Sequence, residues 1–310
     1  MPNIKDVALI FPGQGSQYVG MGKELYLISS HAREIFDRSE KLLNFEIKRA
    51  CFAGPEELLK LTTVCQPAIL TLSIAVLKTF LSHPKAKNIN VKFAAGLSLG
   101  EYSALVASGA ISFDEAIVLV RQRAEFMEEE AIAHPGKMAA IIGLEKEKVI
   151  KICDDIGAEV ANLNAPGQVV ISGSNGNVDR AMEVAKEGGA KAVVALEVSG
   201  AFHSSLMQGA ALRFSDVLKT ADISTPKIPV ISNVTALPET EPEQIRQNLF
   251  KQIDSSVLWE DSIRYIISKG VNTFLEIGPG KVLKGLLRRI DSTLTVYNIE
   301  KPSDIESLPF

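Results

Sequence analysis

The sequence predicts an α/β protein in which a small domain with its own α/β pattern is inserted into a larger one. Three observations favour this fold. Strand-sized apolar runs alternate with helical periodicity over residues 1–135. Residues 136–198 then follow the order βαββαβ, which is the ferredoxin-like pattern. The first alternation resumes over 199–310, so the large domain is expected to be discontinuous along the chain.

Each element of the large domain has its own signal. Short apolar runs that end at turn residues predict strands, and apolar residues that recur every three or four positions predict helices. The expected strands are 7–11, 93–97, 230–234 and 273–277. The expected helices are 31–43, 55–61, 66–80, 99–107, 113–132, 204–219, 242–252, 256–269 and 280–290.

The inserted domain begins after His134-Pro135-Gly136, which breaks the helical pattern. Glycines just past the two helical stretches indicate where those helices end. The expected strands are 137–144, 159–164, 168–172 and 192–198, and the expected helices are 146–156 and 178–186.

Composition excludes several classes of protein. At 310 residues and 46% hydrophobic content the chain can bury a full core. A net charge of −4 and a pI near 5.7, with no basic stretch interleaved with aromatic residues, argue against nucleic-acid binding. We expect no secretory signal and no membrane span.

The cysteines and histidines give no metal-ligand spacing, so no metal site is expected. Three cysteines, an odd number, are typical of free thiols in a reducing compartment, which predicts a cytoplasmic protein. The residues are Cys51, Cys65, Cys153, His31, His83, His134 and His203.

A nucleophilic serine is predicted at the junction of strand 93–97 and helix 99–107. Ser98 is the centre of a G-x-S-x-G segment flanked by Gly96 and Gly100. A turn this tight needs glycines, exposes the hydroxyl at the sheet edge, and points the first helical N–H groups at an oxyanion formed there. The alternative is a strand–turn–helix corner in which Ser98 only caps the helix.

A glycine-rich loop at 12–17 follows the first strand. It fits neither the dinucleotide-binding glycine pattern nor the P-loop, since Tyr18 stands at the third glycine position and no Gly-Lys-Ser/Thr follows. Its backbone N–H groups are expected at the same sheet edge as Ser98, where they could complete an oxyanion hole. A plain strand-end turn is the alternative.

His203 is the best candidate for the general base that a serine nucleophile needs. It follows strand 192–198, where the chain returns to the large domain, whereas the other histidines lie in helices, loops or the domain break. No aspartate or glutamate stands out by context as a third member.

Six segments in order now identify the chain as similar to a known family. It resembles the malonyl-CoA:acyl carrier protein transacylases and the acyltransferase domains of fatty-acid and polyketide synthases, over almost its whole length. The segments are Phe-Pro-Gly-Gln-Gly-Ser-Gln (11–17), Gly-Leu-Ser-Leu-Gly-Glu-Tyr (96–102), Arg-Gln-Arg (121–123), Asn-Ala-Pro-Gly-Gln-Val-Val-Ile-Ser-Gly (164–173), Ala-Phe-His-Ser (201–204) and Glu-Ile-Gly-Pro-Gly (276–280).

The resemblance implies an α/β-hydrolase-like large domain with the ferredoxin-like insertion, and a cleft between them. It implies transfer of a malonyl group from malonyl-CoA to acyl carrier protein through Ser98 and His203. The backbone N–H groups of Gln14 and Leu99 would form the oxyanion hole. A backbone carbonyl at Gln252 would orient His203 in place of a carboxylate.

Substrate choice is expected to depend on two further residues. By resemblance, Arg123 clamps the free malonyl carboxylate, as a planar guanidinium can with two hydrogen bonds. Arg121 is expected to face another side of the helix. Phe202 accompanies malonyl over methylmalonyl choice in the family, although it could be ordinary core.

Several points stay open at this stage. Leu97 stands where many relatives have histidine, and either Asn162 or Asn164 could face the cleft. Lys281, Lys284 and Arg288 share one helical face that could dock an acidic carrier protein or could simply be solvated.

The partners expected are malonyl-CoA and acyl carrier protein, with no cofactor, no nucleic acid and no membrane, and with a monomeric chain. Alternatives are a serine thioesterase or esterase, a trans-acting acyltransferase of polyketide synthesis, and a non-catalytic acyl- or CoA-binding module.

Overall fold

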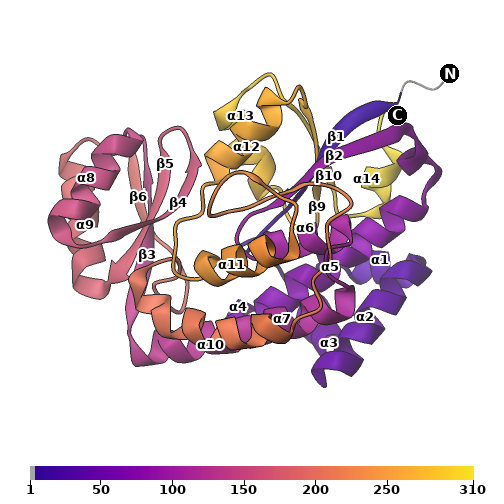
Figure 1. Ribbon diagram of the computed structural model, residues 1–310, viewed down its shortest axis with the longest axis horizontal. Coiled ribbons are helices and arrows are strands. Elements are labelled where there is room, and N and C mark those ends of the chain that lie inside the picture. Colours follow the sequence, from indigo (N-terminus) through magenta and orange to yellow (C-terminus); the bar gives the residue numbers. More distant parts are fainter. Residues whose placement is uncertain (1–3) are drawn as a thin grey trace.

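Two separate β-sheets organise the protein. The computed structural model describes residues 4–310, and Figure 1 shows the small sheet and its helices beside the larger α/β body. The large sheet has six strands in the order β10-β9-β1-β2-β7-β8, all parallel except β8. Its strands are β1 (Lys5–Phe11), β2 (Ile89–Gly96), β7 (Val230–Ile231), β8 (Pro238–Glu239), β9 (Thr273–Ile277) and β10 (Thr295–Ile299).

The central strand β1 is buried on both faces. Val7, Leu9 and Phe11 contribute to one apolar cluster, whereas Ala8 and Ile10 contribute to a second cluster on the opposite face. A continuous apolar run is what a parallel strand covered on both sides requires. The large domain is therefore a three-layer α/β structure, as the sequence predicted.

Helices cover both faces of the large sheet. The first apolar cluster is formed with α1 to α7, α10 and α11, and the second with α12 and α13. The helices are α1 (Lys23–Ile28), α2 (Ser30–Leu43), α3 (Ile47–Ala53), α4 (Glu56–Lys60), α5 (Thr62–Ser82), α6 (Gly100–Ser108), α7 (Phe113–Ala133), α10 (Gln208–Thr220), α11 (Pro242–Gln252), α12 (Trp259–Ser268), α13 (Val282–Ile290) and α14 (Pro302–Glu306), with 3₁₀ turns η1 (Pro84–Asn88) and η2 (Ser205–Met207).

The small sheet is antiparallel, with strand order β4-β5-β3-β6 and two helices on it (Figure 1). This order and the βαββαβ sequence confirm the predicted ferredoxin-like fold. A third apolar cluster lies entirely within this unit. The elements are β3 (Gly136–Ile142), α8 (Lys146–Ile156), β4 (Glu159–Ala165), β5 (Gln168–Ser174), α9 (Asn175–Glu187) and β6 (Ala192–Ala195).

Helix α5 is the most apolar helix of the core. Within the described part of the chain it is the one helix long and apolar enough to cross a membrane, but 83% of its most apolar window is buried inside the protein. It begins four residues before the predicted start because Pro67 is tolerated inside it. A proline cannot donate to the carbonyl four residues earlier, and here that Thr63 carbonyl accepts from Arg121 Nη1 at 2.9 Å instead.

Several further elements differ from the sequence prediction: β2 begins four residues earlier and β6 ends three residues earlier than expected, and the elements not predicted are α1, α3, α14, β8 and β10. Strand β10 was not predicted, because its burial alternates irregularly at a sheet edge and gives little periodic signal. Strand β7 stops at Ile231, since the next residues form a turn in which Ser232 N–H donates to the Leu237 carbonyl. The expected helix 204–219 begins with the 3₁₀ turn η2 before α10.

Backbone contacts that only glycine allows fix the junction of β2 and α6. A Cβ on Gly100 would lie 2.1 Å from the Phe11 carbonyl oxygen, and one on Gly96 would lie 1.9 Å from the Gly100 carbonyl carbon. Helix α6 can therefore pack directly against the ends of β1 and β2.

We expect Gly100→Ala to destabilise the protein by about 1–3 kcal/mol or more, because the added methyl must push two backbone segments apart. Gly285→Ala is the matched control, since its Cβ would meet no atom within 4 Å in α13. It should be neutral or stabilising by up to about 1 kcal/mol. Urea unfolding of both variants measures this, and equal midpoints would contradict the argument.

Candidate active site

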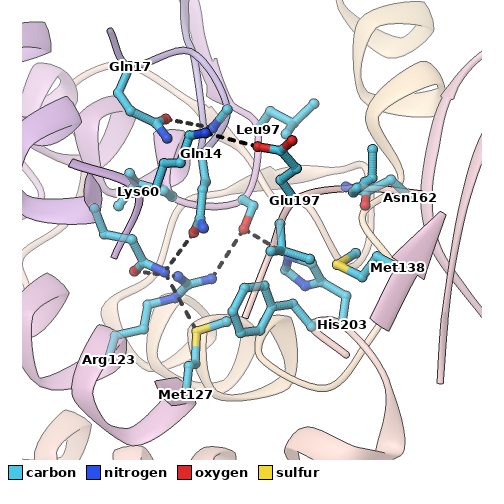
Figure 2. Close-up of a pocket in the computed structure, with 17 residues that line it drawn as sticks. Gln14, Gln17, Lys60, Leu97, Arg123, Met127, Met138, Asn162, Glu197 and His203 are labelled. Carbon is cyan, nitrogen blue, oxygen red and sulfur yellow. Dashed lines mark hydrogen bonds and ion pairs between the residues drawn. The ribbon is translucent and has the colours of Figure 1, made fainter. Parts of the chain in front are cut away.

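A cavity of about 370 Å³ is lined by residues from both the large and the small domain (Figure 2). The large domain contributes the loop after β1, the turn after β2 and one face of α7, whereas the small domain contributes Met138 and Asn162. Among the residues that line this cavity are Gln14, Ser98, Leu99, Arg123, Phe202 and His203, all of them predicted site residues.

Ser98 occupies a strained turn at the end of β2. Its φ of 50° is in the left-handed region, which is uncommon for a residue with a side chain. Asn233 holds this turn from both sides: its Oδ1 accepts from Ser98 N–H at 2.6 Å, and its Nδ2 donates to the Gly96 carbonyl at 2.7 Å. The result is the strand–turn–helix geometry of a nucleophile elbow.

His203 connects the serine to a backbone carbonyl. Its Nε2 lies 2.8 Å from Ser98 Oγ, and its Nδ1 lies 2.7 Å from the Gln252 carbonyl oxygen. A carbonyl only accepts, so the proton of the neutral imidazole is on Nδ1 and Nε2 is free to accept from the serine hydroxyl. This is the arrangement a general base requires, with no carboxylate on Nδ1.

The electrostatic environment keeps His203 neutral. Burial, together with the nearby charge of Arg123, lowers its pKa to about 4, against the opposing effect of the hydrogen bond to the Gln252 carbonyl. An imidazole that is unprotonated at neutral pH can take the serine proton.

Two backbone N–H groups beside Ser98 are available to an oxyanion. Among residues 4–310, neither Gln14 N–H nor Leu99 N–H has a hydrogen-bond partner. The loop that carries Gln14 approaches the Leu97 backbone so closely that only glycine fits at position 13. A Cβ on Gly13 would lie 2.4 Å from the Leu97 carbonyl oxygen. Unpaired donors on both sides of a nucleophile are typical of an oxyanion hole.

Arg123 is completely buried on α7, and Figure 2 shows it among the side chains that line the cavity. Its Nη1 donates to Gln66 Oε1 at 2.8 Å, and its Nη2 lies 2.9 Å from Gln252 Oε1 and 3.2 Å from Ser98 Oγ. Its Nε has no partner among the described residues. A buried guanidinium bonded only to neutral groups can still bind an anion.

Arg121 behaves differently, as the helical spacing predicts. It is half-buried, pairs with Glu125 at 2.6 Å and donates to the Thr63 carbonyl. The two arginines therefore face different surroundings although they are two residues apart.

The other open positions are now placed. Phe202 is 5% exposed and, like Leu97, lines the cavity. Asn162 also lines the cavity, whereas Asn164 does not. Lys281, Lys284 and Arg288 lie at the start and along one side of α13, and within residues 4–310 none of them is in a salt bridge. Docking on this row stays a prediction.

Three residues in contact with the site were missed. Gln66, Asn233 and Glu101 each bond to a predicted site residue. Two had a usable signal: Asn233 is a polar residue near the end of the predicted strand 230–234, and Glu101 is the one charge in the predicted helix 99–107. Gln66 had none, because its helix comes from a different part of the chain.

The described residues contain no group of three His, Cys, Asp or Glu side chains placed to hold a metal ion. All three cysteines are free and buried, and burial raises the pKa of each thiol. These thiols are poor nucleophiles, which leaves Ser98 as the candidate.

Comparison with known proteins agrees with this site. Residues 8–300 match the acyl transferase domain family. A malonyl CoA-acyl carrier protein transacylase of Bacillus subtilis is 48% identical over 305 residues, which is 97% of this chain and 95% of that protein. The structure of a malonyl CoA-acyl carrier protein transacylase from Coxiella burnetii superposes with a TM-score of 0.95 at 37% identity, covering 99% and 98% of the two chains.

A further similar structure contains a second protein. It is a type II PKS acyl-carrier protein in complex with its malonyl-transacylase, with a TM-score of 0.93, 36% identity and 98% coverage of both chains. Fold and site together define an α/β enzyme class with a serine at a nucleophile elbow. Within that class, the chain belongs to the acyl transferase domain family.

We expect the His203 imidazole to titrate near pH 4 rather than at its usual pKa of about 6.5. NMR of the histidine ring signals, assigned by comparison with His203→Gln, measures this. Between these two pH values His203 is protonated in the unfolded chain but not in the folded chain. The folded protein therefore loses stability as pH falls from about 6.5 to about 4. A His203 titration at 6.5 would contradict the burial argument.

Proposed function

We propose that this protein transfers the malonyl group from malonyl-CoA to the phosphopantetheine thiol of acyl carrier protein, in fatty-acid biosynthesis. The observation that carries the proposal is the Ser98–His203 pair with the buried Arg123 guanidinium 3.2 Å from the serine oxygen. Membership of the family and the printed names of its relatives support it.

The first half-reaction loads the serine. His203 Nε2 takes the Ser98 hydroxyl proton as Oγ attacks the thioester carbonyl carbon, and the N–H groups of Gln14 and Leu99 bind the resulting oxyanion. The C–S bond then breaks. The proton on His203 passes to the departing CoA sulfur, which leaves malonyl-Ser98.

The second half-reaction reverses these steps with a new thiol. His203 takes the proton of the carrier protein's phosphopantetheine thiol, and the sulfur attacks the malonyl-serine carbonyl. The C–O bond to Ser98 breaks, and the proton on His203 returns to Oγ. Atoms and protons balance without a metal or a redox cofactor.

Arg123 explains why the acyl group should be malonyl. A free carboxylate beside Ser98 can replace neutral contacts of a buried guanidinium with charge-assisted hydrogen bonds. Phe202 lines the same cavity and would limit room for an α-methyl branch. The Gln252 carbonyl is a neutral orienter of His203, which suits an activated thioester.

A serine thioesterase or esterase is not favoured. It would need a carboxylate on His203 Nδ1, and that position is bonded to the Gln252 carbonyl. A polyketide carrier protein remains an alternative acceptor, because a similar structure holds one.

The setting of the enzyme is also proposed. We place it in the cytoplasm, consistent with three free buried cysteines, and we expect a monomer. We divide the chain into a catalytic domain of residues 1–135 and 199–310 and a small domain of residues 136–198. The separate sheets and the third apolar cluster support this division.

Ser98→Ala should abolish the covalent malonyl adduct formed with malonyl-CoA, because the attacking oxygen is removed. Ser103→Ala is the matched control, since it removes a buried hydroxyl on α6, the helix that follows Ser98. Intact-protein and peptide mass spectrometry measure the adduct. The adduct on the wild-type protein should persist in buffer. It should discharge when carrier protein or free CoA is added, because thiols ionise more readily than water.

Two outcomes would overturn this part of the proposal. Full adduct formation by Ser98→Ala would exclude Ser98 as the nucleophile. Loss of the adduct from wild-type protein at the same rate with and without acceptor would favour a hydrolase.

Arg123→Ala should reduce malonyl transfer far more than acetyl transfer, because acetyl lacks the carboxylate. Losing a shielded charge-assisted pair should cost about 2–5 kcal/mol in kcat/KM for malonyl-CoA. Arg121→Ala is the matched control on the same helix. Equal losses for the two acyl donors would assign Arg123 a structural role.

A further inference from the structure

A fully buried carboxylate lies directly behind the residue that orients His203. Glu101 is in the first turn of α6 and is 0% exposed. One of its oxygens accepts a short hydrogen bond from Gln252 Nε2, and both lie 3.3–3.4 Å from the Asn233 backbone N–H. It contacts neither His203 nor Ser98 Oγ by hydrogen bonds, so the mechanism above does not use it.

Both partners of Glu101 hold the reacting groups. Asn233 fixes the Ser98 elbow through its side-chain amide. Gln252 also donates from Nε2 to the Ser98 carbonyl at 3.0 Å, accepts from Arg123 at Oε1, and binds His203 through its backbone carbonyl. Glu101 is therefore connected to the nucleophile, the base and the candidate substrate clamp through a single intervening residue, Gln252 or Asn233.

The orientation of the Gln252 amide depends on this carboxylate. An ionised carboxylate only accepts hydrogen bonds, so it selects Nε2 of Gln252 and leaves Oε1 facing Arg123. The reverse orientation would place an NH₂ group against the guanidinium. A donor–donor contact in a buried site would cost free energy and displace the arginine.

We propose that Glu101 is a positioning residue that acts through Gln252, setting the amide so that Arg123, Ser98 and His203 stay in one arrangement. His203 has no carboxylate on Nδ1, but the residue that binds this nitrogen, Gln252, is itself hydrogen-bonded to the Glu101 carboxylate. The inference rests on the proposed function and deepens it, since it assigns a residue on which acyl choice and serine reactivity both depend.

The neighbouring buried carboxyl differs from Glu101 in its contacts. Glu239 is bonded to Asn248 at 2.8 Å and has no hydrogen bond to Ser98, Arg123, His203 or Gln252 among the described residues. Burial and the charge of Glu101 raise the pKa of Glu239 well above its usual value. Burial also raises the pKa of Glu101, to about 7, while Gln252, Asn233 and Arg123 oppose the rise.

Glu101→Gln is the direct test. In either orientation its new NH₂ faces a donor, Gln252 Nε2 or Asn233 N–H. We expect malonyl transfer to fall about 10- to 100-fold in kcat/KM, as for partners that support a reacting residue. Acetyl transfer should fall less, because it does not use Arg123. Glu239→Gln, which resembles the protonated acid, is the control and should stay within about twofold of wild type.

A double variant separates positioning through Gln252 from a general structural effect. If Glu101 acts through Gln252, Glu101→Gln combined with Gln252→Ala should be no slower than Gln252→Ala alone, within about twofold. Losses that multiply would overturn the inference. Wild-type rates and wild-type malonyl-over-acetyl preference in a folded Glu101→Gln protein would also overturn it.

Thermal unfolding shows whether each variant is folded. If Glu101→Gln does not fold, Glu101→Asp carries the test, because it keeps the charge but withdraws it from Gln252. We expect it to lose transfer activity in the same direction, and wild-type activity would overturn the inference.

A fluorophosphonate probe that labels reactive serines keeps the two proposals distinguishable. Its reaction with Ser98 needs His203 but no malonyl group. If wild type reacts with the probe and not with malonyl-CoA, the proposed function fails. In that case a slower probe reaction in Glu101→Gln than in Glu239→Gln still supports positioning, and equal reactions overturn it.

Discussion

The position of the cleft depends on how closely the backbone packs at the C-terminal ends of β1 and β2. Gly100 brings α6 against the Phe11 carbonyl, and Gly13 brings the loop after β1 against the Leu97 carbonyl. These two approaches leave the N–H groups of that loop and of α6 on either side of one hydroxyl. A side chain at either glycine would separate them. The chemistry of the site therefore begins with main-chain sterics, before any charge is considered.

The positive charge of Arg123 is not neutralised by a direct ion pair, so it stays available to bind an anion. Arg123 is buried, forms no salt bridge with a described residue, and is bonded by the neutral amides of Gln66 and Gln252. Burying a cation without an anion is unfavourable, and burial lowers its pKa accordingly. The Glu101 carboxylate reduces this cost from beyond Gln252 without contacting the guanidinium by a hydrogen bond. A direct ion pair would have left no charge for an acyl carboxylate.

The sequence predicted the fold class, the order of most elements and the residues now found around the cavity. The predictions of Ser98 and His203 depended on local signals, namely the glycine spacing around the serine and a histidine after a strand. The roles of Arg123, Gln14, Leu99 and Phe202 were expected from the family resemblance. Among the residues that support them, Gln252 was expected only from the family resemblance, and Asn233 was not predicted. Gln252 and Asn233 meet Ser98 only because distant segments converge at one sheet edge, with separations of 154 and 135 residues. Edge strand β10 gave no clear periodicity.

The small domain is attached to the large one more firmly on one side of the cleft than on the other. On one side, Leu163 N–H donates to the Val257 carbonyl at 2.9 Å and Val257 N–H donates to the Ala161 carbonyl at 2.8 Å, which joins β4 to the segment after α11. Across the cleft, the Lys60–Glu197 pair is exposed and exchanges easily with water. Any widening therefore costs least at the Lys60 side. The Lys60 side is therefore where the cleft opens most readily to a long thioester arm.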